Sequence, residues 1–68
     1  MAEPVYRAVE IVGTSSESVT KAIETAIARA SKTLRHLGWF EVVGVRGAIE
    51  DGKVQRYQVT LKVGFTLE

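Results

Sequence analysis

The sequence predicts a small α+β domain in which one amphipathic helix packs on a three-stranded antiparallel sheet, in the order β-α-β-β. Two observations predict this fold class. Stretches rich in β-branched and aromatic residues flank a single stretch of helical periodicity. An Asp-Gly pair then separates the last two β-type stretches, which is typical of a hairpin. Because the chain has only 68 residues, we expect a single domain over residues 1–68.

The first strand is predicted over residues 5–12, where Val9 and Ile11 share one face of a loose alternation. Thr14 and Glu17 follow with the spacing of a capping box, in which the hydroxyl and the carboxylate each satisfy an unpaired backbone N–H. We therefore expect the helix to begin at Thr14.

The helix is predicted to continue for about five turns, because apolar residues recur at intervals of three and four. Arg35 and His36 suit the negative pole of the helix dipole, and Gly38 is expected to end the helix. The apolar stripe consists of Val19, Ala22, Ile23, Ala26, Ile27, Ala30, Leu34 and Leu37.

Two further strands are predicted over residues 39–49 and 54–67, joined by a turn at 50–53. The last strand alternates strictly, which indicates one dry face that packs on the helix. A helix shields only about 10 Å of width. We therefore expect the sheet to use its uncovered surface for contacts with other copies of the chain. The residues of the dry face are Tyr57, Val59, Leu61, Val63, Phe65 and Leu67.

The composition also favours self-association. A domain of this size is marginally stable alone, and small domains usually compensate with disulfides, a structural metal or oligomerisation. The chain has no cysteine and one histidine, which excludes the first two solutions. The hydrophobic fraction of 46% is high for so small an interior.

The charges nearly cancel, with nine Lys and Arg against eight Asp and Glu. This balance argues against a nucleic-acid partner, although Arg29, Lys32 and Arg35 form a basic edge on the predicted helix. No apolar run is long enough to cross a bilayer, and the start lacks the pattern of an export signal. We expect a cytoplasmic protein without a membrane partner.

Motifs of enzymes are missing, so we expect no catalytic residues, no metal ligands and no enzymatic activity. The glycines Gly44 and Gly47 lie inside a strand pattern, where they indicate a bulge or a close backbone approach. The carboxylates Glu50 and Asp51 belong to the predicted turn.

One constellation suits a planar ligand. Trp39, the only tryptophan, opens a strand and offers an aromatic face, while the amide of Gln58 matches the edge of a heteroaromatic ring. Arg46 has the donors for a phosphate or polyol tail. The alternative is that Trp39 is a core or subunit-interface anchor, in a structural or protein-interaction shell without a ligand.

Trp39 and Arg46 are seven positions apart, so a regular strand would turn them to opposite faces. We therefore predict an irregularity near Gly44 or Gly47, or a pocket built from different subunits.

The whole chain resembles the dodecin family of small flavin-binding proteins. The segments that carry the resemblance are Tyr6, Val9–Ser15, Ala28–Ala30, Trp39–Val42, Arg46–Gly47 and Tyr57–Phe65. The resemblance implies a helix partly wrapped by the three-stranded sheet and a hollow homododecamer. It also implies flavin storage, sequestration and photoprotection, by flavin pairs stacked between symmetry-related tryptophans.

The resemblance places the flavin contacts at Trp39, Gln58, Arg46, Gly38 and Val45. Many bacterial members have an acidic residue before the tryptophan and an arginine after the last-strand phenylalanine, where this chain has Gly38 and Thr66. Either FMN or riboflavin therefore fits as ligand. Some members also bind coenzyme A, for which the candidate contacts here are Tyr6, Arg29 and Lys32.

Overall fold

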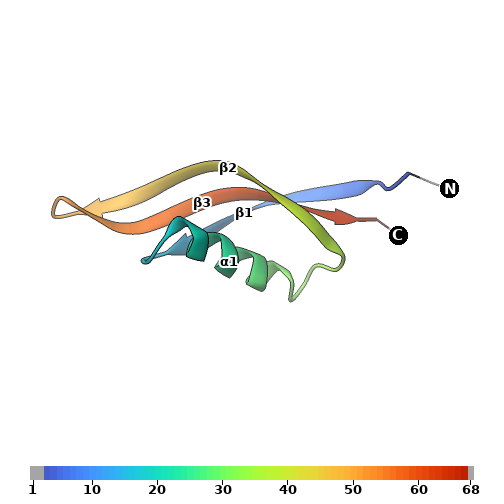
Figure 1. The fold of residues 1–68 in the computed structure, drawn as a ribbon, viewed down its shortest axis with the longest axis horizontal. Coiled ribbons are helices and arrows are strands. Elements are labelled where there is room, and N and C mark those ends of the chain that lie inside the picture. Colours follow the sequence, from blue (N-terminus) through green and yellow to red (C-terminus); the bar gives the residue numbers. More distant parts are fainter. Residues whose placement is uncertain (1–2, 68) are drawn as a thin grey trace.

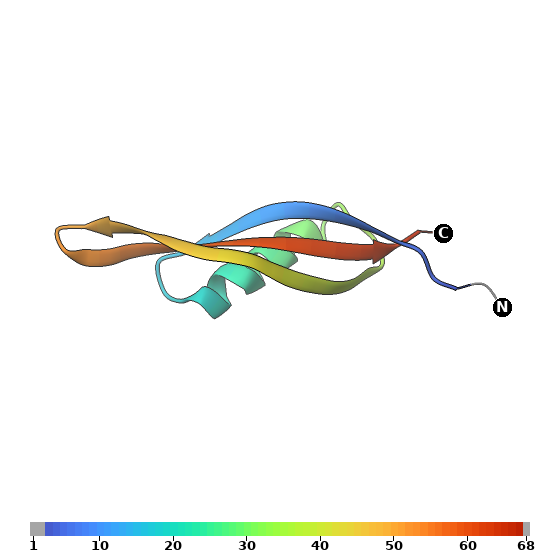
Figure 2. The same ribbon diagram turned by 90° about the horizontal axis from the view of Figure 1, so that it is seen from above.

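The computed structural model describes residues 3–67, and it confirms the predicted fold class (Figure 1). The elements are β1 (Tyr6–Ser15), α1 (Val19–Ala30), β2 (Leu37–Glu50) and β3 (Lys53–Thr66). They form one antiparallel sheet in the order β1-β3-β2, with α1 on one face. The molecule is elongated, with extents of 56 × 20 × 14 Å, because the β2-β3 hairpin projects beyond the helix (Figure 2).

The hairpin turn is as predicted. Asp51 and Gly52 both have positive φ angles, of 53° and 76°. This is the backbone of a type I′ turn, which matches the right-handed twist of the strands that it joins and favours Asp-Gly. The carboxylates of Glu50 and Asp51 are exposed at this tip, as expected for turn residues.

The predicted start of the helix is wrong. Thr14 lies inside β1, and the helix is capped by Ser18, whose Oγ accepts a hydrogen bond from the backbone N–H of Lys21 at 3.0 Å. The Oγ of Ser15 accepts the N–H of Glu17 at 2.9 Å and thereby forms the turn before the cap. Serine is favoured over threonine at the N-cap of a helix. Ser15, Ser16 and Ser18 all lie close enough to the helix start to be considered as the N-cap.

The predicted end of the helix is also wrong, because α1 stops at Ala30 and not at Gly38. The hydroxyl of Ser31 donates to the carbonyl of Ala28 at 2.8 Å, an alternative to helical pairing that weakens a helix interior. The left-handed conformation expected at Gly38 is found at His36, with φ of 63°, but His36 also lies beyond the end of α1. Leu34 and Leu37 follow the helix, and Leu37 opens β2.

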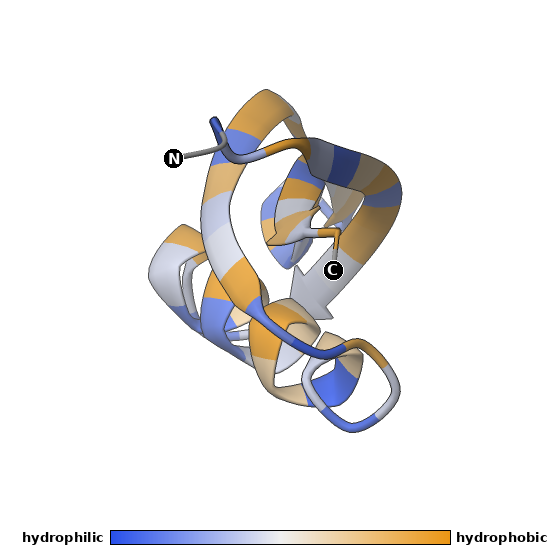
Figure 3. Cartoon of the chain, turned by 90° about the vertical axis from the view of Figure 1, so that its right-hand side faces the viewer, coloured by the Kyte–Doolittle hydropathy of each residue, from blue (hydrophilic) through white to orange (hydrophobic). Residues whose placement is uncertain are grey.

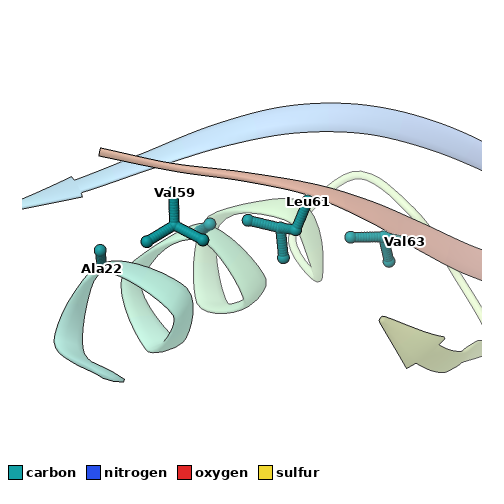
Figure 4. Packing of buried hydrophobic residues seen from close by; sticks show 5 residues of the cluster. Ala22, Val59, Leu61 and Val63 are labelled. Carbon is teal, nitrogen blue, oxygen red and sulfur yellow. The ribbon is translucent and has the colours of Figure 1, made fainter. Parts of the chain in front are cut away.

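The core is formed by alternate residues of β3 and by alanines of α1 (Figure 4). Alanine lets the helix lie close to the sheet, and one close approach is at Gly13 of β1. A Cβ atom on Gly13 would collide with the backbone oxygen of Ala22 and lie 2.8 Å from the Cβ of Ala26. The buried residues are Ala22, Ala26, Ala30, Val59, Leu61 and Val63.

The helix covers only part of the sheet, as the sequence predicts. It packs mainly on β1 and β3, and the helix-facing side of β2 is only partly covered. In the view along the molecule, orange hydrophobic stretches alternate with hydrophilic ones on the chain (Figure 3). There Phe40, Val42 and Val45 lie opposite core residues of β3 but are 48%, 42% and 54% exposed. Such an apolar strip is unusual on a monomer and is typical of a surface that another protein molecule covers.

We predict that Gly13→Ala destabilises the fold by about 1–3 kcal/mol, because the new methyl group forces the helix away from the sheet. Chemical denaturation of the purified protein measures this change. Gly44→Ala is the matched control, since a Cβ atom there would meet no atom within 4 Å. Equal stability of the two variants would contradict the close approach at Gly13.

A second pair of glycines isolates backbone conformation from packing. Gly52 and Gly44 both have open space around the Cβ position, but only Gly52 has a positive φ angle. We therefore expect Gly52→Ala to lower the free energy of unfolding by about 1–2 kcal/mol relative to Gly44→Ala. A thermal melt of both variants checks this, and Gly52→Asn should be milder because asparagine tolerates the left-handed region.

Candidate functional site

Trp39 lies on the face of the sheet opposite the helix. It pairs with Gly64 of β3, a neighbour of the core residue Val63, and side chains of adjacent residues point to opposite faces. The indole lies against Gly64, where a Cβ atom would collide with its Cε2 and Cζ2 atoms. Trp39 remains 40% exposed. One part of the indole is thus held by the sheet and another part is open.

Tyr6 supports the indole from the other side of β3. The two rings meet edge to face, with centroids 6.0 Å apart and planes at 64°. They come from β1 and β2, which are two strand spacings, or about 10 Å, apart. The rings reach each other because Gly64, in the strand between them, has no side chain.

The predicted irregularity near Gly44 is present. The register of β2 against β3 shifts between Val42 and Gly44, so Val43 is an extra residue without a direct partner. This is the arrangement of a β-bulge, which re-aims the side chains that follow it. As a result Arg46 lies opposite Gln58, and both share the outer face with Trp39. Gly47 also makes the expected close approach, since a Cβ there would lie 2.7 Å from the oxygen of Arg56.

One copy of the chain does not bring the predicted site together. Trp39 pairs with Gly64, and Arg46 pairs with Gln58, six residues further along β3. At a rise of about 3.3 Å per residue, the backbone positions of these two pairs are about 20 Å apart along the strand. This separation favours a pocket to which more than one copy contributes.

The two other predicted contacts lie apart as well. Gly38 is next to Trp39, in a register shift between Leu37 and Trp39, and a Cβ there would make an ordinary contact of 3.5 Å with Tyr6. Packing within the subunit therefore leaves room for a side chain at this position. Val45 belongs to the apolar strip on the helix-facing side, opposite to the face of Arg46.

Hollows lie beside the helix in the described residues, and a small one of about 180 Å³ is lined by Ile27, Gly38 and Trp39 among others. Two larger ones are also present. One, of about 580 Å³, lies between α1 and β2 and is lined by Ile23, Ile27 and Phe40 among others. The other, of about 540 Å³, lies between α1 and β1 and includes Arg29 and Lys32. Tyr6, on the outer face of the sheet, does not line this second hollow, so these three residues are not brought together in one subunit.

Comparison with known proteins identifies the family of this chain. The model of the dodecin family matches residues 5–68 of this chain. The dodecin of Thermus thermophilus is 59% identical over 64 residues, which make up 94% of this chain and 93% of that protein. The chain belongs to the dodecin family. Dodecins are known as small flavin-binding proteins without enzymatic activity, and flavin binding is therefore the function at the level of the family.

Solved dodecin structures also match the fold. The dodecin of Streptomyces coelicolor superposes with a TM-score of 0.94 at 56% identity, covering 100% of this chain and 97% of that one. The dodecin of Streptomyces davaonensis gives 0.92 at 54% identity, with 98% of each chain covered. Together with the family, these structures indicate an oligomer that takes a small-molecule ligand.

Two searches of the described residues returned nothing. Residues 3–67 contain no helix with the length and apolarity to span a membrane. The same part of the chain holds no cluster of three or more His, Asp or Glu side chains arranged for a metal ion.

Sequence reasoning missed the roles of Gly64 and Tyr6 beside Trp39. A glycine inside the strictly alternating last strand is a signal for a close approach by another group. The sequence holds no signal for which group approaches, because that depends on β3 lying between the other two strands.

Proposed function

We propose that this dodecin binds and sequesters flavin in pairs, stacked between symmetry-related copies of Trp39 in a hollow homododecamer. The observation that supports this most is the indole, held against Gly64 and 40% exposed on an outer face that Arg46 and Gln58 share. An aromatic ring that is fixed on one side and open on another suits a planar guest. The role is storage and photoprotection, without chemical turnover.

The residues divide the work by their chemistry. Trp39 supplies the stacking surface, and its indole quenches an excited flavin by electron transfer. Gln58 presents a planar amide that can donate to and accept from the edge of the isoalloxazine ring. Arg46, exposed on the same face, is suited to the ribityl or phosphate tail. Gly38, next to Trp39, is proposed as a backbone contact. Val45 lies on the helix-facing side, so its proposed apolar contact comes from a different copy than the indole.

The separation of about 20 Å within one copy fits a pocket made between copies. The apolar strip of Phe40, Val42 and Val45 and the hollow beside α1 then become surfaces that neighbouring subunits cover. We propose a dodecamer built from single-domain subunits over residues 1–68, located in the cytoplasm.

The ligand is FMN or riboflavin. Thr66 in place of an arginine removes one cation near the tail, and this leaves Arg46 as the proposed contact for either tail. Coenzyme A is a second proposed ligand. Arg29 and Lys32 support it, because both line the hollow between α1 and β1 and phosphate groups favour such cations.

We expect the purified protein to carry yellow flavin with quenched fluorescence. Trp39→Ala should weaken flavin affinity by about fivefold to about a hundredfold, since stacking of a planar base on an aromatic ring contributes about 1–3 kcal/mol. Fluorescence titration with FMN and riboflavin measures this, and Trp39→Phe should fall in between. Native mass should stay unchanged. If Trp39→Ala instead broke the assembly and no flavin copurified, Trp39 would be a subunit anchor in a ligand-free shell.

A complementation experiment tests the pocket between copies. One variant lacks the indole (Trp39→Ala), and the other lacks the polar pair (Arg46→Ala with Gln58→Ala). Each alone should bind flavin poorly. Coexpressed, they should form mixed oligomers that recover binding at a fraction of the sites, because one copy supplies the indole and another the polar pair. Absence of any recovery in verified mixed oligomers would place all three residues of a pocket on one copy.

A further inference from the structure

The indole of Trp39 is held by two residues that come from different strands. Gly64 of β3 lies directly beneath it, so closely that any Cβ atom would overlap the ring. Tyr6 of β1 presents its ring edge to face, with a centroid distance of 6.0 Å. Edge-to-face pairs at this distance are attractive beyond their buried area.

These contacts limit the motion of the indole in different ways. A tryptophan on a strand has rotamers that place the ring along the strand or across the sheet. The empty space above Gly64 admits the ring across β3, and Tyr6 then blocks further movement toward β1. Because Trp39 is still 40% exposed, the contacts orient the ring without burying it.

We propose that Tyr6 and Gly64 are positioning residues, which fix the plane of Trp39 before a flavin arrives. This inference rests on the proposed stacking function. A ring that is already oriented loses less conformational freedom when a ligand stacks on it, so binding is stronger.

The variants follow from the geometry. Tyr6→Ala removes the lateral contact, and Tyr6→Phe keeps the ring and removes only the hydroxyl. Gly64→Ala inserts a methyl group where the indole lies, and the three atoms nearest to it all belong to the Trp39 side chain. A side chain can move aside, so the fold should survive. Gly44→Ala is the control glycine, with no atom within 4 Å of its Cβ position.

The first measurement needs no ligand. Trp39 is the only tryptophan, so time-resolved fluorescence anisotropy of the flavin-free oligomer reports on this ring alone. We expect faster local rotation in Tyr6→Ala, wild-type behaviour in Tyr6→Phe and Gly44→Ala, and a shifted emission maximum in Gly64→Ala. Unchanged rotation and emission in both Tyr6→Ala and Gly64→Ala would overturn the proposal.

The second measurement is titration with riboflavin and with FMN. Tyr6→Ala should bind about three- to tenfold more weakly than wild type, Tyr6→Phe should restore affinity, and Gly64→Ala should lose at least about tenfold. Native mass spectrometry establishes that each variant assembles. Wild-type affinity in both Tyr6→Ala and Gly64→Ala would overturn the proposal. Failure of the wild-type protein to bind any flavin would refute the stacking function instead, while the anisotropy would still decide whether the ring is held.

A double variant covers the case in which Gly64→Ala fails to fold. If the methyl group acts only through the indole, Gly64→Ala combined with Trp39→Ala should fold as well as Trp39→Ala alone. A destabilisation that persists without the indole would show that Gly64 serves the backbone, and it would remove Gly64 from the proposal.

Discussion

The close approach of one short helix to the sheet is the constraint on which the rest of this structure depends. Gly13 and the alanines of α1 let the two backbones come almost into contact. Because Gly13, Ala22 and Ala26 have little or no side chain, the helix packs tightly on β1 at this point. The helix packs mainly on β1 and β3, and the apolar residues Phe40, Val42 and Val45 of β2 are left 42–54% exposed.

The incomplete cover and the ligand site are two results of the same architecture. A sheet with a helix on only one face has a second face free, and Trp39, Arg46 and Gln58 all lie on that face. The bulge at Val43 is what aligns them, because without the extra residue Arg46 would point toward the helix side. A single inserted residue in β2 thus places Arg46 on the same face as Gln58.

Much of the fold follows from patterns of short range. The alternation in β3 identifies Val59, Leu61 and Val63 as core, and the Asp-Gly pair identifies the turn. The odd spacing between Trp39 and Arg46 predicted either an irregularity near Gly44 or Gly47 or a pocket built from different subunits, and the irregularity is present between Val42 and Gly44. Each of these inferences uses only neighbouring residues and the periodicity of a strand.

The first and last residues of the helix could not be predicted from such local patterns. Several hydroxyl residues lie at each end of α1, and the choice of Ser18 as cap depends on where β1 stops pairing with β3. The apolar period continues past Ala30 to Leu37, although the chain there has already turned toward β2. The contact of Tyr6 with Trp39 depends on strand order, a property of the assembled sheet that no local pattern contains.

The central place of β3 has a consequence for how the molecule folds. β1 and β2 both pair with β3, which is the last of the four elements in chain order. The partners in the β1–β3 pairing are separated by nearly the whole sequence, as Tyr6 and Thr66 are. Contacts between residues so distant along the chain slow folding, because a long loop must close before they form. During synthesis, therefore, β1 and the helix emerge first and remain without a sheet until translation of β3 is complete.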